Sequence, residues 1–209
     1  MIAEKEKNGF KASLAYIFSR NPVLVLGLVI GQLAAGDTTL KNGVALSITY
    51  LLITVPVLVF ASVIGKKLPD WLKIVSYAVL SAAMLLPSYF ICGSISATIF
   101  DSLGIYPALL AVSTVPIVYS EKIAENKKPI SALVNGICIA FGFAITAFIL
   151  GAAREILGSG SLFGFKVVKP VFPAAKLPFW GFIFLGFMAA LVNFIKEFIK
   201  KPTGEEEKE

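Results

Sequence analysis

Charged residues are absent from six long stretches of the 209-residue chain, and this pattern restricts the fold more than any other feature. The uncharged windows cover residues 21–36, 42–65, 74–100, 102–120, 129–153 and 177–195. An α-helix crosses a bilayer with about 20 apolar residues, so every window except the first is long enough. Apolar residues make up 57% of the chain and charged residues 15%, which excludes an ordinary soluble domain. The sequence predicts an all-α polytopic membrane protein with six transmembrane helices.

Two of the six windows contain residues that break a continuous helix. The first holds a proline and three glycines, and the fourth holds two prolines, a glycine and the Ser113–Thr114 pair. Each interrupted segment is followed by two longer apolar segments. We therefore predict two inverted three-helix repeats, residues 21–100 and 101–199, in which the first and fourth helices are discontinuous. In membrane transporters, such corresponding interrupted segments point to a binding site near the middle of the bilayer.

Basic residues are distributed unevenly between the two sides of this arrangement. With six spans, 14 Lys and Arg residues fall on the side of the two termini and the 66–73 and 121–128 loops, against 5 on the other side. The positive-inside rule then places both termini in the cytoplasm. The chain is predicted to be a single membrane domain, 1–209, with a cytoplasmic segment at 1–20 that lacks a secretory signal peptide and a charged tail at 200–209. The net charge of +6 is explained by topology and by contact with lipid headgroups, and requires no nucleic acid.

The six windows contain no Asp, Glu, Lys or Arg, and the chain has no histidine. A charge in the middle of a transmembrane helix costs about 2.5–3.5 kcal/mol and is normally kept for a function. A proton pump with a carboxylate in mid-membrane, a histidine-ligated haem and a hydrolase triad are therefore disfavoured. The remaining candidates for an ion or small-molecule path are Gln32, Ser113, Thr114, Asn135 and the carbonyl groups freed where the half-helices break. Helix packing is the alternative role for each of these side chains.

The two cysteines, Cys92 and Cys138, are predicted to be separate buried thiols. Counted at about 1.5 Å per residue from the cytoplasmic ends of their spans, Cys92 lies on the order of 27 Å deep and Cys138 on the order of 14 Å deep. They are therefore not expected to form a disulfide or to share one metal cluster.

The fifth window ends at Arg154 and Glu155, the first charged residues after 25 uncharged ones. We predict that these two residues form an ion pair at the membrane interface. The Gly-Ser-Gly sequence that follows permits a sharp turn.

The stretch Gly151–Phe165, GAAREILGSGSLFGF, is the most distinctive part of the sequence. Together with Asn-Pro at 21–22 and the short motifs SLGI at 102–105 and SAL at 131–133, it resembles the Rnf/Nqr family of integral membrane subunits. That family includes the E subunit of the Rnf electron-transport complex and the D subunit of the sodium-translocating NADH:quinone reductase. The resemblance covers residues 20–195.

The resemblance implies a subunit of a prokaryotic cytoplasmic membrane, paired with a homologous, A-subunit-like partner of opposite topology and with other Rnf-type subunits. In the family, each partner contributes one cysteine from each of its half-helices to an intramembrane [2Fe–2S] cluster. The family motifs read GLCP and TNC, and their cysteines fall on Gly31 and Thr114 of this chain. Neither residue can replace a thiolate ligand.

The chain is therefore expected to be a non-catalytic subunit of a redox-driven, ion-translocating complex. It is expected to bind no cofactor alone, and to share a [2Fe–2S] cluster only if a partner supplies the ligands. We further predict that Gly31 and Thr114 face a common cavity. A secondary transporter that reuses the inverted-repeat fold is the alternative function, and a purely structural assembly subunit is another.

Overall fold

The computed structural model describes residues 21–121 and 128–200. The predicted cytoplasmic segment 1–20, all but the first residue of the predicted charged tail 200–209, and most of the 121–128 loop lie outside the described residues. The described part of the chain is almost entirely helical, with two two-residue strands. Its elements are α2 (Ile30–Gly36), α3 (Leu40–Ile64), η1 (Gly65–Lys67), α4 (Asp70–Ala83), α5 (Leu85–Leu103), α6 (Tyr106–Ala111), α7 (Thr114–Tyr119), α8 (Pro129–Ser159), β1 (Ser161–Leu162), β2 (Phe165–Lys166), η3 (Pro173–Lys176) and α9 (Pro178–Lys200).

Within the described residues, four helical stretches are long and apolar enough to cross a membrane. They cover Leu40–Lys67, Asp70–Ser94, Pro129–Ser159 and Pro178–Phe198. This finding confirms the all-α polytopic fold. The other two predicted spans are the interrupted segments, which the structure divides into short helices and turns. The division into two inverted repeats at residue 100 stays a prediction.

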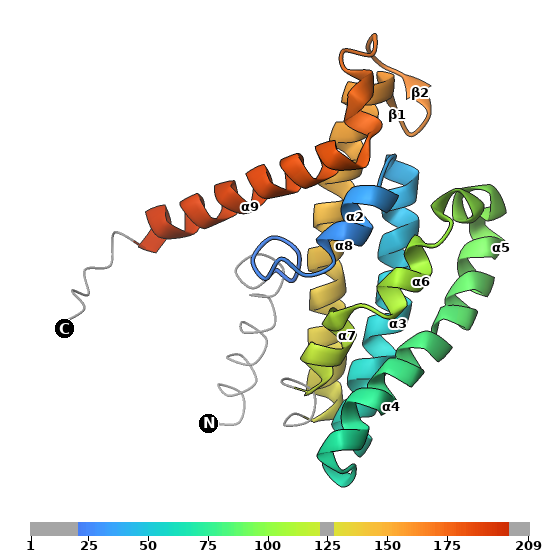
Figure 1. Ribbon diagram of the computed structural model, residues 1–209, viewed down its shortest axis with the longest axis vertical. Helices are drawn as coiled ribbons and strands as arrows, with labels where there is room; N and C mark the ends of the chain where they lie inside the picture. The colour runs from blue at the N-terminus through green and yellow to red at the C-terminus, as the bar shows by residue number, and fades with distance from the viewer. Residues whose placement is uncertain (1–20, 122–127, 201–209) are drawn as a thin grey trace.

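The helices α3 and α8 form the centre of the molecule and lie side by side along their length (Figure 1). They are antiparallel, because Leu40 at the start of α3 contacts Glu155 near the end of α8. At the other end of the pair, Gly136 of α8 faces Val55 of α3. A Cβ atom added to Gly136 would lie 3.3 Å from the Val55 Cα, so the absence of a side chain lets the two backbones approach closely.

The first interrupted segment contains hydrogen-bonded turns before α2 begins. Gly27 and Val29 adopt positive φ angles of 67° and 56°, which no α-helix accommodates, so α2 begins only at Ile30. Asn21 anchors this segment. Its Oδ1 accepts from the Val23 N–H at 2.9 Å, and its Nδ2 donates to the Gly142 carbonyl of α8 at 2.9 Å. The interruption therefore lies where the sequence predicts it, and is attached to the central helices.

The fourth predicted span is interrupted at Val112 and Ser113, between α6 and α7. Pro107 lies in the first turn of α6, where the missing N–H costs no helical hydrogen bond. At the other end of α6, the Ser81 hydroxyl of α4 donates to the Ala111 carbonyl. This bond gives a partner to a carbonyl group at the helix end, as a break inside a membrane requires.

The last helix, α9, diverges from the bundle (Figure 1). It contacts α2 near its own beginning, where a Cβ atom on Gly181 would lie 2.6 Å from the Ala34 carbonyl oxygen. Further along, Phe187 and Phe198 are more than 70% exposed within this chain. Much of α9 therefore presents apolar surface to lipid or to another protein.

Candidate functional site

The predicted pathway residues lie on the two interrupted segments and on α8. Gly31 and Gln32 are in the first turn of α2, with Gly31 exposed and Gln32 half-buried. Ser113 is buried at the break before α7, next to Thr114, the first residue of α7. Asn135 is buried in α8. Gly31 and Gln32 thus share one turn of α2, and Ser113 and Thr114 lie together at the break between α6 and α7.

The two interrupted segments meet at Gly36 and Tyr106. A Cβ atom on Gly36 would lie 3.0 Å from the Tyr106 Cβ, so the end of α2 packs directly on the start of α6. This contact lies several residues away from both Gly31 and Thr114. The common cavity for these two positions stays a prediction, because the Thr114 side chain is outside the described part of the structure.

Neither of the two positions on which the family's ligand cysteines fall carries a thiol in this chain. At Gly31, a built Cβ atom would have no atom within 4 Å, so the position has room for a side chain but supplies no ligand atom. Among the described residues, no three Cys, Asp or Glu side chains come together. Cys92 and Cys138 are both buried and free, which confirms their predicted character as separate thiols. The Cys92 thiol lies 3.7 Å from the Thr49 hydroxyl.

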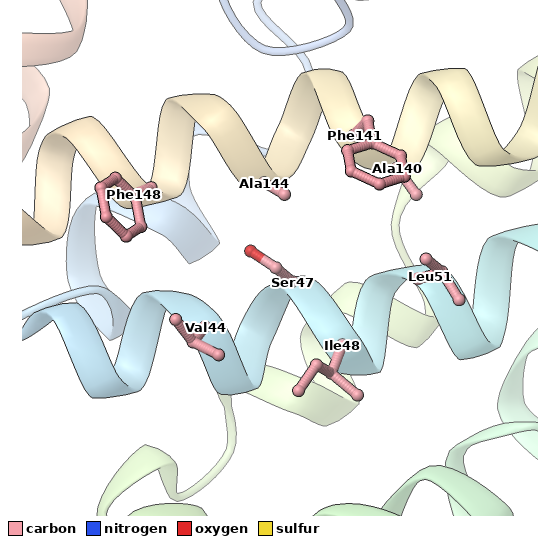
Figure 2. A pocket seen from close by; sticks show the side chains of 8 residues that line it. All are labelled: Val44, Ser47, Ile48, Leu51, Ala140, Phe141, Ala144 and Phe148. Carbon is pink, nitrogen blue, oxygen red and sulfur yellow. The ribbon is translucent and has the colours of Figure 1, made fainter.

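A groove of about 220 Å³ lies between α3 and α8 (Figure 2). Its single polar side chain, Ser47, donates its hydroxyl to the Gly43 carbonyl of its own helix at 2.6 Å. Ligand pockets typically enclose about 300–1,000 Å³ and present a few convergent polar groups. The groove therefore suits an apolar chain better than a polar substrate. The other lining residues are Val44, Ile48, Leu51, Ala140, Phe141, Ala144 and Phe148.

A network of buried polar groups surrounds Arg154 at the end of α8, and Arg154 itself is 2% exposed. All five N–H groups of its guanidinium have a main-chain carbonyl acceptor. The acceptors are Ala175 for Nε (3.0 Å), Ala34 and Asp37 for Nη1 (2.6 and 2.8 Å), and Lys176 and Leu177 for Nη2 (2.7 and 3.3 Å). One side chain thus joins the end of α2, the following link and the segment that leads into α9. The Ala34 carbonyl belongs to the last turn of α2, where a cation is favourable.

The predicted ion pair between Arg154 and Glu155 is wrong. Successive residues on a helix point in directions about 100° apart, and these two side chains reach different partners. Glu155 Oε2 accepts from the Leu40 N–H at 2.9 Å, at the start of α3. Its Oε1 accepts from the Gly164 N–H at 2.9 Å and from the Ser161 hydroxyl at 3.3 Å. Glu155 therefore connects the start of α3 to the β1–β2 hairpin.

Asp37 is the third member of this region and is fully buried, although the sequence places it in a polar link. Its two carboxyl oxygens have no hydrogen-bond partner in the structure. Burial raises the pKa of Asp37 well above its usual range, and the positive charge of Arg154 and the nearby Gly151 N–H oppose this effect only in part. A buried carboxyl group without a donor is costly, so it requires an explanation.

The sequence analysis did not identify the region where α2, α3 and α8 meet around Asp37, Arg154 and Glu155, which is called the joint below. It chose candidate site residues only from inside the six uncharged windows, whereas all three of these residues lie just beyond a window boundary. A usable signal was nevertheless present. A lone acidic residue following an interrupted segment, and an Arg-Glu pair following a long apolar window, are charges that folding can bring to the same end of antiparallel helices.

Comparison with known proteins gives one family and several relatives. Residues 10–199 match the family described as "Rnf-Nqr subunit, membrane protein". The chain is 29% identical over 158 residues to the E subunit of the ion-translocating oxidoreductase complex of Buchnera aphidicola subsp. Acyrthosiphon pisum, covering 66% of this chain and 65% of the relative. It is 28% identical over 201 residues to the E subunit of the same-named complex of Shewanella oneidensis, covering 88% and 87%.

A third relative comes from Clostridium ljungdahlii and is named as the E subunit of the proton-translocating ferredoxin:NAD(+) oxidoreductase complex. It is 26% identical over 138 residues, covering 65% of this chain and 62% of the relative. The chain thus spans a little under two thirds of the length of the Buchnera and Clostridium relatives.

Proposed function

Because the chain belongs to the Rnf-Nqr family of membrane subunits, we propose that it is a membrane subunit of an Rnf-type, ion-translocating electron-transport complex. The observation that carries this proposal is the family match over residues 10–199, which includes both interrupted segments and the central α3–α8 pair. The relatives bear the names of subunits of multi-subunit oxidoreductase complexes, and this supports the same role here.

The proposed direct partner is a homologous membrane subunit of opposite topology. The exposed apolar surface of α9 supports this, because a helix that diverges from its own bundle leaves room for another chain (Figure 1). The side of α4 and α5 is also rich in exposed apolar residues, among them Val79, Leu86 and Phe90.

Both termini are proposed to face the cytoplasm, because most of the basic residues lie on their side of the predicted spans.

We propose that this chain supplies no ligand to an iron–sulfur cluster. Gly31 has no side chain, Thr114 is no substitute for a thiolate, and both cysteines are buried elsewhere in the chain. The chain would then support the partner and line part of a path through the membrane. Electrons would pass through ligands carried by other subunits.

The subunit proposal is tested by tagging the chain in its native membrane and identifying what co-purifies. Rnf-type subunits in constant proportion to the tagged chain are expected. A matched variant, Phe187→Asp, places a charge on the exposed part of α9 and should reduce recovery of the partner, whereas Lys169→Asp on the exposed segment before η3 should not. A tagged chain that is folded but recovered alone from native membranes would overturn the proposed complex.

The ligand proposal is tested by iron and acid-labile sulfide content, with an EPR spectrum of the reduced sample. The chain expressed alone should contain no iron. Any [2Fe–2S] signal of the complex should survive Cys92→Ser and Cys138→Ser. Loss of the signal in either variant would show that this chain does supply a ligand.

A further inference from the structure

The Asp37 carboxyl group occupies a space that two glycines create. Asp37 lies in the link between α2 and α3, outside the membrane-spanning helices. A Cβ atom on Gly43 of α3 would lie 2.7 Å from Asp37 Oδ1, and one on Gly151 of α8 would lie 2.6 Å from the same oxygen. Both distances are shorter than any ordinary contact. The carboxyl group therefore fits only because neither helix carries a side chain at this point.

Two main-chain carbonyl oxygens lie beside this space. The Cβ position on Gly43 lies 3.1 Å from the Ala147 carbonyl oxygen, and the position on Gly151 lies 3.1 Å from the Thr39 carbonyl oxygen. An ionised carboxylate accepts hydrogen bonds and cannot donate, so neighbouring carbonyl groups repel it. A protonated carboxyl carries one O–H and can donate it to such a carbonyl. The Arg154 charge and the nearby Gly151 N–H favour the ionised form, but burial outweighs both, so the surroundings of Asp37 favour the protonated form.

Arg154 does not pair with this carboxyl group directly. Its five N–H groups are all used on main-chain carbonyls, one of which is that of Asp37 itself. No nitrogen of Arg154 lies within 4.0 Å of an Asp37 carboxyl oxygen. The positive charge of Arg154 lowers the pKa of Asp37, but burial raises it by more. The charged residues on the surrounding elements are Lys41 (α3), Asp101 (α5), Arg154 and Glu155 (α8), and Lys176 (η3), and Tyr106 lies at the start of α6.

We infer that Asp37 is a proton-binding site, which keeps its proton while α2, α3 and α8 are packed together and releases it when this joint opens. On release, the proton passes to water that enters the opened joint, and the carboxylate is solvated there. The joint lies directly after α2, so proton exchange at Asp37 is linked to the position of the first interrupted segment. This inference rests on the contacts of the joint alone, and holds whatever partners the chain has.

The experiment is isotope-edited infrared spectroscopy of the protein in lipid. The chain contains only three aspartates, Asp37, Asp70 and Asp101, and the last two are exposed. At about pH 6, an exposed aspartate is ionised. Aspartate labelled with ¹³C at the side-chain carboxyl should therefore reveal one protonated carboxyl band, which is lost in Asp37→Asn and kept in the matched Asp70→Asn and Asp101→Asn variants. Comparing wild type with Asp37→Asn also cancels the aspartates of any partner that co-purifies.

Two infrared results would overturn the inference. One is the absence of a protonated band at this pH, and the other is a band that persists in Asp37→Asn. The amide of Asp37→Asn can donate to the same carbonyl groups, so this variant should melt no earlier than wild type, with the advantage growing as the pH rises. A lower melting temperature at every pH would instead identify Asp37 as an ionised partner of Arg154.

If Asp37→Asn cannot be recovered folded, the labelled wild type still decides the question. Its protonated aspartate band should persist at about pH 6 while the joint is intact, and disappear when the protein is unfolded at the same pH. A band that is absent from the folded protein would contradict the inference without any variant.

Discussion

Arg154 donates to the main-chain carbonyl of Asp37 at 2.8 Å, while the carboxyl group of the same aspartate has no hydrogen-bond partner. A buried Asp and a buried Arg that lie near each other usually suggest an ion pair. Here, the arginine instead holds the backbone of the link after α2, and the carboxyl group lies between α3 and α8. The joint between these helices therefore depends on main-chain acceptors, and this determines how its variants should behave.

Replacing Arg154 should destabilise the protein strongly. Arg154→Gln leaves several of the five buried carbonyls without a donor, and each buried unsatisfied group costs about 1–3 kcal/mol. Arg154→Lys keeps the charge but offers three donors in place of five, so it should rescue only part of the loss. The free energy of unfolding in detergent measures the effect. Lys169→Gln removes the same charge from an exposed position and should have little effect; equal losses in the two variants would contradict the role of the network.

The two glycines beside Asp37 should resist substitution. Gly43→Ala and Gly151→Ala each place a methyl group within 2.7 Å of Asp37 Oδ1 and about 3.1 Å from a backbone carbonyl, so each should destabilise by about 1–3 kcal/mol. Gly186→Ala on α9 is the matched control, because its Cβ atom would meet nothing within 4 Å. The free energy of unfolding of Gly186→Ala should rise by up to about 1 kcal/mol, because alanine has a higher helix propensity than glycine. Melting temperatures in one detergent compare all three, and a stabilising Gly151→Ala would disprove the tight fit.

Glu155 should stabilise the start of α3 because its two carboxyl oxygens accept hydrogen bonds from the Leu40 and Gly164 N–H groups. Glu155→Gln turns one acceptor oxygen into an NH₂ group that faces an N–H donor, so the bond to Leu40 or to Gly164 is lost. We expect a loss of about 1–3 kcal/mol, together with faster amide hydrogen exchange at Leu40 or at Gly164. Glu197→Gln, on an exposed part of α9, is the control. Unchanged exchange at both Leu40 and Gly164 in Glu155→Gln would refute the connection.

Stability should also depend on pH through Asp37. Its pKa is raised in the folded protein, so the folded state binds more protons than the unfolded state between the two pKa values. The contribution of this group to stability is therefore complete below about pH 4, the unfolded value, and is lost as the pH rises through the folded value. Unfolding measured from acid to neutral pH should show this decline in wild type, and Asp37→Asn should lack it. A contribution that increases with pH would indicate a depressed pKa instead.

A thiol at Gly31 should report on the partner surface. The position is exposed and has space for a side chain, so Gly31→Cys should fold and react readily with a maleimide in the isolated chain. The two native cysteines are buried and should contribute little background labelling. Leu33→Cys, two residues further along α2 at a fully buried position, should react slowly. In the complex, the Gly31→Cys thiol should react more slowly with the maleimide if this face of α2 contacts the partner. Full reactivity in the complex would place the partner elsewhere.

The candidate site residues were chosen from the sequence in two different ways. Gly31 and Thr114 were chosen by alignment with family motifs, and Ser113 and Asn135 because polar groups inside a membrane are uncommon. The structure shows Ser113 and Asn135 buried, and α8, which carries Asn135, packs on α3, a helix distant in the sequence. Local sequence could not indicate which residues Asn135 faces, because α3 and α8 are nearly uniform in hydrophobicity on all sides.

The sequence by itself determined where the chain can cross a membrane and where its helices must break. Uncharged windows, prolines and glycines act locally, through the cost of burying charge and through the backbone angles that each residue permits. The tertiary structure decided which groups meet at the ends of these helices. Asp37 lies 117 residues before Arg154, and only the antiparallel packing of α3 on α8 brings Asp37, Arg154 and Glu155 together. The pKa of Asp37 follows from that packing, because burial is a property of the assembled joint and not of the residue.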